Sequence, residues 1–204
     1  MHLLGQRLLG ILILLLLAML VAVKRSASGS VLERPAGALL AQLVNVFNLF
    51  FLLVVNPLAA ILLIAGRLEA VDPTHVTVTV PWLLALLEVV GLLKYVIGFG
   101  LMAWALTRLG RNYQLGGSAP RAGDRMVAAG PYRLVRHPMY TSALGIAFGL
   151  ALLTQSLAFF TVFCAYVVLV VMLIPAEEDG LRRAYGDEYA AYQRKTRKVI
   201  PFVY

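Results

Sequence analysis

The residues from Thr141 to Ile174 form a run of 34 residues without one charged side chain. As a single helix this run would be about 51 Å long, whereas the hydrocarbon core of a bilayer is roughly 30 Å thick. The polar cluster Thr154-Gln155-Ser156 near its middle is the natural place for a turn, with Ser156 as the N-cap of the second half. The sequence therefore predicts a tight helical hairpin whose two ends emerge on the same side of a membrane.

The composition of the chain indicates a membrane protein as well. Of 204 residues, 61% are hydrophobic and only 14% are charged, whereas a typical soluble domain has roughly 45–50% apolar and about 25% charged residues. These values exclude a disordered chain and argue strongly against a soluble domain, which has too little interior for so much apolar surface. The single cysteine and the three histidines form no disulfide or metal-ligand pattern, so we expect no metal.

Three further apolar runs precede the hairpin and are long enough to span a bilayer. They cover Leu8–Val23, Leu39–Gly66 and Trp82–Leu106. Asn56-Pro57 predicts a kink in the second run, and Pro175 is expected to end the hairpin. The predicted fold is thus an all-α integral membrane protein with five transmembrane helices, of which the last two form the hairpin.

The net charge of +8 indicates how these helices are oriented. The central stretch Thr107–Tyr140 contains six arginines and one aspartate, whereas the connection Arg67–Pro81 is net acidic. Because basic residues gather in cytoplasmic loops, we predict that the central stretch and the C-terminal tail are cytoplasmic and that the N-terminus lies outside. The positive charge then requires no nucleic acid partner. The membrane is expected to be the inner or plasma membrane.

The charged tail that follows Pro175 has the periodicity of an amphipathic helix. Its less polar residues recur at spacings of three and four, at Leu181, Tyr185, Tyr189, Tyr192, Thr196 and Val199. Gly186-Asp187 is expected to interrupt this helix as a stop followed by a new N-cap. The basic cluster from Arg194 to Lys198 favours contact with anionic lipids.

Folding the hairpin brings the polar segments at its two ends together. Gly130–Tyr140, with the sequence GPYRLVRHPMY, precedes the first helix, and the pair Glu177-Glu178 follows the second. A cation, an imidazole, two carboxylates and several tyrosines thus converge beside an apolar cleft, where a polar cofactor and a lipid could bind. The chemistry of these residues is equally consistent with anchoring at the membrane interface.

Residues 130–204 resemble the isoprenylcysteine carboxyl methyltransferase family and the membrane phosphatidylethanolamine N-methyltransferases. The resemblance lies in the segment GPYRLVRHPMY, the apolar hairpin and the tail AEEDGLRRAYGDEYAAYQRKTRKVIPF, in this order. The resemblance implies an enzyme that transfers a methyl group from S-adenosylmethionine by in-line displacement. Its acceptor would be lipophilic: an isoprenoid or prenylcysteine carboxylate, or a phospholipid amine. Residues 1–106 would provide three transmembrane helices and residues 107–204 the catalytic region, with a cytoplasmic cofactor pocket between the hairpin ends and the C-terminal helix. The choice of acceptor and the oligomeric state stay open.

The resemblance also implies site residues. Those matched to cofactor binding are Gly98, Gly100, Tyr132, His137, Pro138, Tyr140, Glu177, Glu178, Tyr189 and Tyr192. Carboxylates can accept hydrogen bonds from the cofactor ammonium or ribose, and tyrosine rings attract a sulfonium. Arg136 and Arg194 are assigned as catalytic residues that hold an anionic acceptor.

Three residues of the third span are each compatible with a structural role as well as a functional one. Close packing between helices accounts for Gly98 and Gly100 as well as a cofactor does. Lys94, near the middle of the membrane, either pairs with a structural partner such as Glu88 or acts in the site.

Two other classes of function are compatible with parts of the sequence. The membrane sterol reductases, which bind NADPH in a related fold, resemble the tail through its terminal residues 200–204. Those reductases tend to have Arg-Asp in place of Glu177-Glu178, and two carboxylates would repel the 2′-phosphate of NADPH, which favours a methyltransferase. A transporter is disfavoured because the five spans show no duplicated halves.

Overall fold

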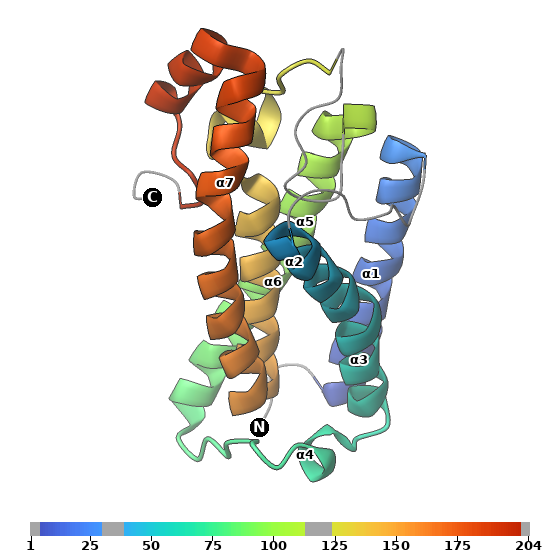
Figure 1. Cartoon of the computed structure of the whole chain (residues 1–204). Helices are drawn as coiled ribbons and strands as arrows, with labels where there is room; N and C mark the ends of the chain where they lie inside the picture. Colours follow the sequence, from blue (N-terminus) through green and yellow to red (C-terminus); the bar gives the residue numbers. More distant parts are fainter. Residues whose placement is uncertain (1–4, 30–38, 113–123, 201–204) are drawn as a thin grey trace.

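The computed structural model describes residues 5–29, 39–112 and 124–200, which form a bundle of helices (Figure 1). Arg34, Arg121 and residues 201–204, which contributed to the charge and tail predictions, lie outside these ranges. The long helices are α1 (Gln6–Ser28), α5 (Pro81–Leu109), α6 (Pro138–Thr154) and α7 (Leu157–Lys195). The short ones are α4 (Leu68–Val71) and the 3-10 turns η2 (Gly110–Asn112) and η3 (Gly130–Arg133).

The remaining long helix bends at Asn56-Pro57 without breaking. α2 (Leu39–Phe50) continues through a π-helical turn, η1 (Phe51–Val55), into α3 (Asn56–Ile64). Because Pro57 lacks an N–H, a π-turn before it accommodates the missing hydrogen bond. The Asn56 amide donates to the Phe51 carbonyl (2.8 Å), and its carbonyl oxygen accepts from the Tyr95 hydroxyl of α5 (2.6 Å). The helix is therefore irregular where Asn56-Pro57 predicted it, and the hydrogen bond from Tyr95 holds this point of the helix against α5.

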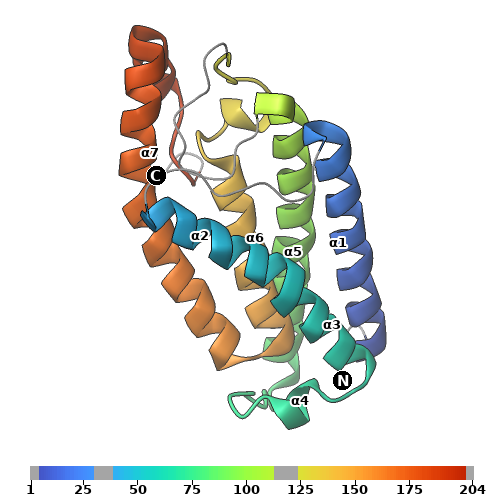
Figure 2. The same cartoon turned by 45° about the vertical axis from the view of Figure 1, so that its right-hand side comes forward.

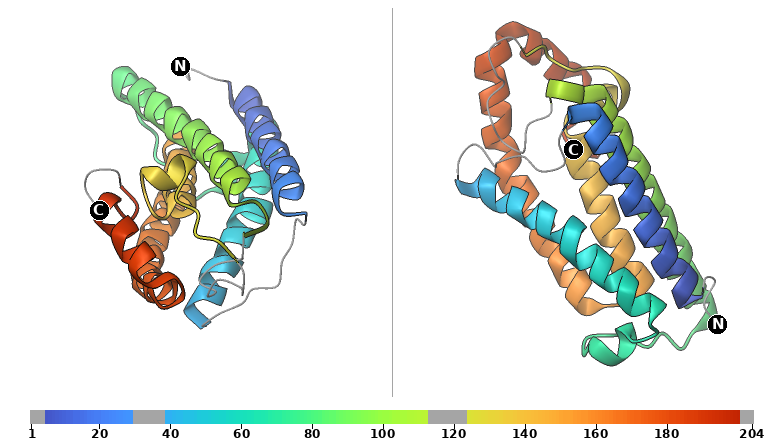
Figure 3. Two further views of the ribbon diagram at one scale, coloured as in Figure 1. Left: turned by 90° about the horizontal axis from the view of Figure 1, so that it is seen from above. Right: turned by 90° about the vertical axis from the view of Figure 1, so that its right-hand side faces the viewer.

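Within the described residues, four helices are long and apolar enough to cross a membrane: α1, the α2–α3 unit, α5 and α7. α6 is apolar but has only 17 residues, about 26 Å of helix. The all-helical membrane fold is therefore confirmed, whereas five complete spans stay a prediction. The α2–α3 unit crosses the bundle obliquely (Figure 2), with α3 packed on α1 and α2 packed on α7 (Figure 3).

The hairpin of α6 and α7 turns at the predicted residues. Gln155 adopts a left-handed conformation with φ of 51°, and the Ser156 hydroxyl caps α7 by accepting from the Phe159 N–H (3.2 Å). The loop between α4 and α5 covers this turn, because the Val76 N–H donates to the Gln155 carbonyl (2.9 Å). The turn is thus held both by its own cap and by a distant segment.

Replacing Ser156 by alanine is expected to lower the free energy of unfolding by about 1 kcal/mol, because it removes a buried helix cap. Denaturant titration of the purified protein in detergent measures this loss. Thr161→Ala is the control, since its exposed hydroxyl only bonds back to the Leu157 carbonyl within the helix. Equal stability of the two variants would contradict the capping role.

Pro175 does not end α7, contrary to the prediction from sequence. The helix continues to Lys195 with one non-helical residue, Gly186 (φ 53°, ψ −127°), where the predicted interruption is confirmed. The fixed φ of proline is compatible with a helix, and membrane helices tolerate its missing hydrogen bond. The uncharged part, 157–174, is about 27 Å long and can cross a bilayer by itself. The charged remainder extends beyond the start of α6 and turns back at the break (Figure 1).

Glycines allow α5 and α6 to approach closely. A Cβ atom on Gly149 would lie 2.7 Å from both the Gly91 carbonyl oxygen and the Tyr95 backbone nitrogen, and one on Gly98 would lie 2.9 Å from the Ser142 carbonyl oxygen. The packing role is therefore confirmed for Gly98. Gly100 is exposed, and a Cβ there would meet nothing within 4 Å.

The two ionisable residues of α5 lie in different environments. Glu88 is buried, whereas the Lys94 side chain is exposed on the outer surface of the helix. Glu88 and Lys94 are six residues apart, which corresponds to one full helical turn plus about 240°, so the two side chains point to different faces of α5. The structure thus gives no support to a pair between Lys94 and Glu88.

Candidate functional site

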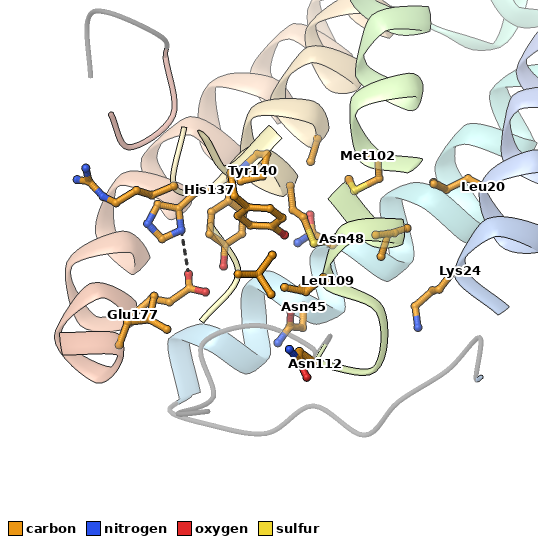
Figure 4. Close-up of a pocket in the computed structure, with 18 of the residues that line it drawn as sticks. Leu20, Lys24, Asn45, Asn48, Met102, Leu109, Asn112, His137, Tyr140 and Glu177 are labelled. Atoms are coloured by element: carbon orange, nitrogen blue, oxygen red, sulfur yellow. Dashed lines mark ion pairs between the residues drawn. The ribbon is translucent and has the colours of Figure 1, made fainter. Parts of the chain in front are cut away.

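A cavity of ≈ 280 Å³ lies at the end of the bundle where α7 carries its charged segment. Its walls come from α1, α2, α5, α6 and α7, together with η3 and residues 124–127. Figure 4 shows His137 and Glu177 on one side of this cavity and Lys24 on the other, with Asn45 and Asn48 between them. Helices far apart in the sequence therefore contribute to one site.

Eight of the twelve predicted site residues line this cavity: Tyr132, Arg136, His137, Pro138, Tyr140, Glu177, Tyr189 and Tyr192. Glu178 lies behind the wall and contacts Arg136 and His137. Arg194 is exposed on α7, and neither it nor the two glycines of α5 belongs to the lining. The convergence predicted from the hairpin is thus confirmed, but these last three residues lie outside it.

Buried charges hold the start of α6 against α7. The Arg136 guanidinium donates to Glu178 Oε1 (2.6 Å) and to the carbonyls of Gln193 (3.2 Å) and Thr196 (2.5 Å). The same Glu178 oxygen lies 3.3 Å from His137 Nε2. Arg136 was expected to hold an anionic acceptor, yet the structure gives its donors these protein partners.

The segment after α7 adds backbone contacts to the same place. The N–H groups of Arg136 and His137 donate to the carbonyls of Arg197 (2.7 Å) and Lys198 (2.9 Å). The Thr141 hydroxyl donates to the Val199 carbonyl (2.7 Å). His137 is therefore fixed by both its main chain and its ring.

Glu178 lies beyond the uncharged, membrane-length part of α7 and stays ionised. Burial disfavours its charge, but hydrogen bonds from His137 and Arg136 outweigh this effect and hold the pKa of the Glu178 carboxyl well below its ordinary value. At neutral pH Glu178 is thus an anion that protein groups already neutralise. The adjacent Glu177 is the carboxylate that faces the cavity.

Some buried polar atoms on the carboxylate and tyrosine side of the cavity have no hydrogen-bond partner among the described residues. They are Glu177 Oε2, which lies 3.7 Å from His137 Nδ1, and the Tyr189 hydroxyl. Burial raises the pKa of Tyr189, so that its hydroxyl keeps its proton and can donate. Because buried polar groups nearly always find a partner, these atoms mark where a polar ligand would bind.

Tyrosines cover much of the same side. The rings of His137 and Tyr140 stack with centroids 5.7 Å apart, and those of Tyr189 and Tyr192 lie 5.9 Å apart. The Tyr192 hydroxyl donates to the Tyr132 carbonyl (2.6 Å), which fixes its ring. The result is an aromatic wall beside a carboxylate, an arrangement that suits a ligand carrying positive charge.

Sequence reasoning missed several residues of the cavity lining. Lys24 of α1, Asn45 and Asn48 of α2, and Tyr166 of α7 all line the cavity. The available signal was the polar residues of the second span, Asn45 and Asn48 among them, since polar residues inside a membrane are costly and mark functional sites.

The chain was compared with known proteins. The sequence model of the phospholipid methyltransferase family matches residues 86–188. The cobalt-zinc-cadmium resistance protein CzcN of Cupriavidus metallidurans is 30% identical over 102 residues, covering 50% of this chain and 47% of CzcN. The chain thus spans about half the length of this curated relative. One solved structure has a similar fold, that of the eukaryotic intramembrane Ras methyltransferase ICMT (isoprenylcysteine carboxyl methyltransferase). The TM-score is 0.54 and the sequence identity 19%, and the match covers 80% of this chain and 74% of that one.

Together, the fold and the family match define the class of protein: an all-helical membrane protein of the phospholipid methyltransferase type. The chain belongs to the phospholipid methyltransferase family, since the match extends over half of its length and includes His137, Glu177 and Glu178. This confirms the resemblance identified from the RHPMY segment and the paired carboxylates. Nothing in the matches favours the sterol reductase alternative.

Proposed function

We propose that this protein transfers a methyl group from S-adenosylmethionine to a lipophilic acceptor at the cavity. The observation that carries the proposal is a pair of buried polar groups without a hydrogen-bond partner among the described residues, Glu177 Oε2 and the Tyr189 hydroxyl, beside the aromatic wall. They fit this cofactor, because a carboxylate accepts from an ammonium or a ribose, a phenol donates to a carboxylate, and aromatic faces attract a sulfonium. When bound, the cofactor supplies a methyl group activated by its positive sulfur.

The residues of the chain would act mainly by positioning. Glu177 would fix the orientation of the cofactor, His137 would hold Glu177, and the tyrosines would keep water away. Correct placement of two reactants can contribute roughly 7–11 kcal/mol to lowering a barrier. A carboxylate acceptor then requires no general base, whereas an amine must arrive neutral. By the distribution of basic residues, the site faces the cytoplasm.

Glu177→Gln and His137→Ala are each expected to weaken S-adenosylmethionine binding at least tenfold while the fold persists. The first removes the charge that would hold the cofactor, and the second removes the ring that holds that carboxylate. Calorimetric titration of the purified protein measures both effects. Glu188→Gln is the matched control, because Glu188 is an exposed acid of the same helix outside the cavity.

The same titration separates the proposal from its alternative. Saturable NADPH binding without S-adenosylmethionine binding would overturn the methyltransferase assignment, and unchanged affinity in both variants would overturn the placement of the cofactor. Incubating the protein with a lipid extract and a labelled methyl donor then identifies the acceptor from the species that gains the label.

A further inference from the structure

The cavity has a second side, whose chemistry differs from that of the carboxylate and tyrosine side. It is formed by the last part of α1 and by α2, which contribute Lys24, Asn45 and Asn48. Between and beside them lie leucines from the same two helices and the turn that follows α2: Leu17, Leu20, Leu49, Leu52 and Leu53. One ammonium and two amides therefore adjoin a hydrocarbon surface, with Lys24 on the side away from Glu177 and the two asparagines between them (Figure 4).

The placement of Lys24 distinguishes it from its neighbour Arg25. Lys24 is partly buried and lines the cavity, whereas its neighbour Arg25 is exposed and does not. Asn45 is 5% exposed. Asn48, which is partly buried, makes no side-chain hydrogen bond to any residue in the described part of the chain, so its amide is available to a ligand.

These groups suit one kind of ligand. An ammonium and amide N–H groups bind oxygen anions, and the leucines suit a hydrocarbon chain. Asp124 and Arg125 also line the cavity, so the basic residues of this region, including Lys24, outnumber the acidic one by two to one. A ligand with an anionic group next to a long apolar chain would satisfy both features.

We propose that Lys24, Asn45 and Asn48 bind an anionic group of the lipophilic acceptor, while its chain lies along the leucines of this second side. This inference rests on the proposed function and specifies its substrate class. Two sources share the chemistry: a carboxylate that itself receives the methyl group, or a phosphate next to a reacting amine. Lys24 is a specificity-determining residue in either case, and neutral lipids are poor acceptors.

The test uses three lipids with the same chain: oleic acid, oleyl phosphate and oleyl alcohol. Their affinities for the full-length protein, saturated with S-adenosylmethionine in neutral detergent, are measured by thermal shift titration. At least one of the two anionic lipids is expected to bind at least tenfold more tightly than the alcohol. The anion that shows this preference distinguishes a carboxylate from a phosphate source.

Variants locate the effect. Lys24→Gln is expected to abolish the preference for the anionic lipid, Asn48→Leu to reduce it, and Lys24→Arg to retain most of it. Arg25→Gln is the matched control and should leave the preference unchanged. Equal binding of the three lipids by the unmodified protein, or equal losses in Lys24→Gln and Arg25→Gln, would overturn the inference. The affinity for S-adenosylmethionine is also measured without lipid. If the unmodified protein does not bind S-adenosylmethionine, the proposed function is contradicted. If Lys24→Gln still binds it, the variant is folded and its lost lipid preference is due to the missing ammonium.

Discussion

Arg136→Met is expected to lower the free energy of unfolding by about 3–5 kcal/mol, the usual effect of leaving a buried charge without its partner. The side chains of Arg136 and Glu178 are only 8% and 7% exposed, and the shared hydrogen bond is 2.6 Å long. The variant would remove the guanidinium that pairs with the Glu178 carboxylate, leaving it only the contacts with His137 and Gln193, and would also release the carbonyls of Gln193 and Thr196. Denaturant titration in detergent, without any ligand, measures the loss.

The exposed pair of Arg182 and Asp179 is a control within the same helix. Its side chains are 54% and 61% exposed and its N–O distance is 3.4 Å. Arg182→Met should therefore cost less than about 1 kcal/mol. The double variant Arg136→Met/Glu178→Met should regain part of the stability lost in Arg136→Met, because it removes the Glu178 charge as well. If Arg136→Met is as stable as Arg182→Met, Arg136 does not hold the tail and its predicted role toward the acceptor is favoured.

Gly149→Ala is expected to destabilise the protein by roughly 1–3 kcal/mol, the usual range for overpacking. Alanine normally favours a helix over glycine by about 1 kcal/mol. Here, however, its Cβ would lie 2.7 Å from backbone atoms of Gly91 and Tyr95. Backbone atoms of two helices cannot give way without separating α5 from α6. Thermal unfolding in detergent is the measurement.

Gly100→Ala is the matched control for this helix pair. A Cβ on this exposed residue would have no neighbour within 4 Å, so the substitution should leave the stability unchanged or raise it slightly. Gly98→Ala should behave like Gly149→Ala, since its Cβ would lie 2.8 Å from Ile146. Similar stabilities for all three variants would show that close approach of α5 and α6 does not depend on these glycines.

Local rules were sufficient for some elements and insufficient for others. Ser156 and Gly186 were predicted correctly because a cap and a left-handed break depend on neighbouring residues only. Pro175 was predicted wrongly because the effect of a proline within a helix depends on what surrounds it. Arg194 matched a motif but is exposed, since the face that a helix turns inward after a break depends on its docking.

By itself, the sequence determined the membrane class, the hairpin and the carboxylate–histidine side of the site, because these follow from an uncharged run of fixed length and from motifs at its two ends. Only the tertiary structure decided that Arg136 joins the start of α6 to α7 and that Lys24 and Asn48 line one cavity with Glu177. The physical reason is that these contacts connect helices far apart in the chain. Neither periodicity nor spacing specifies which faces of such helices meet.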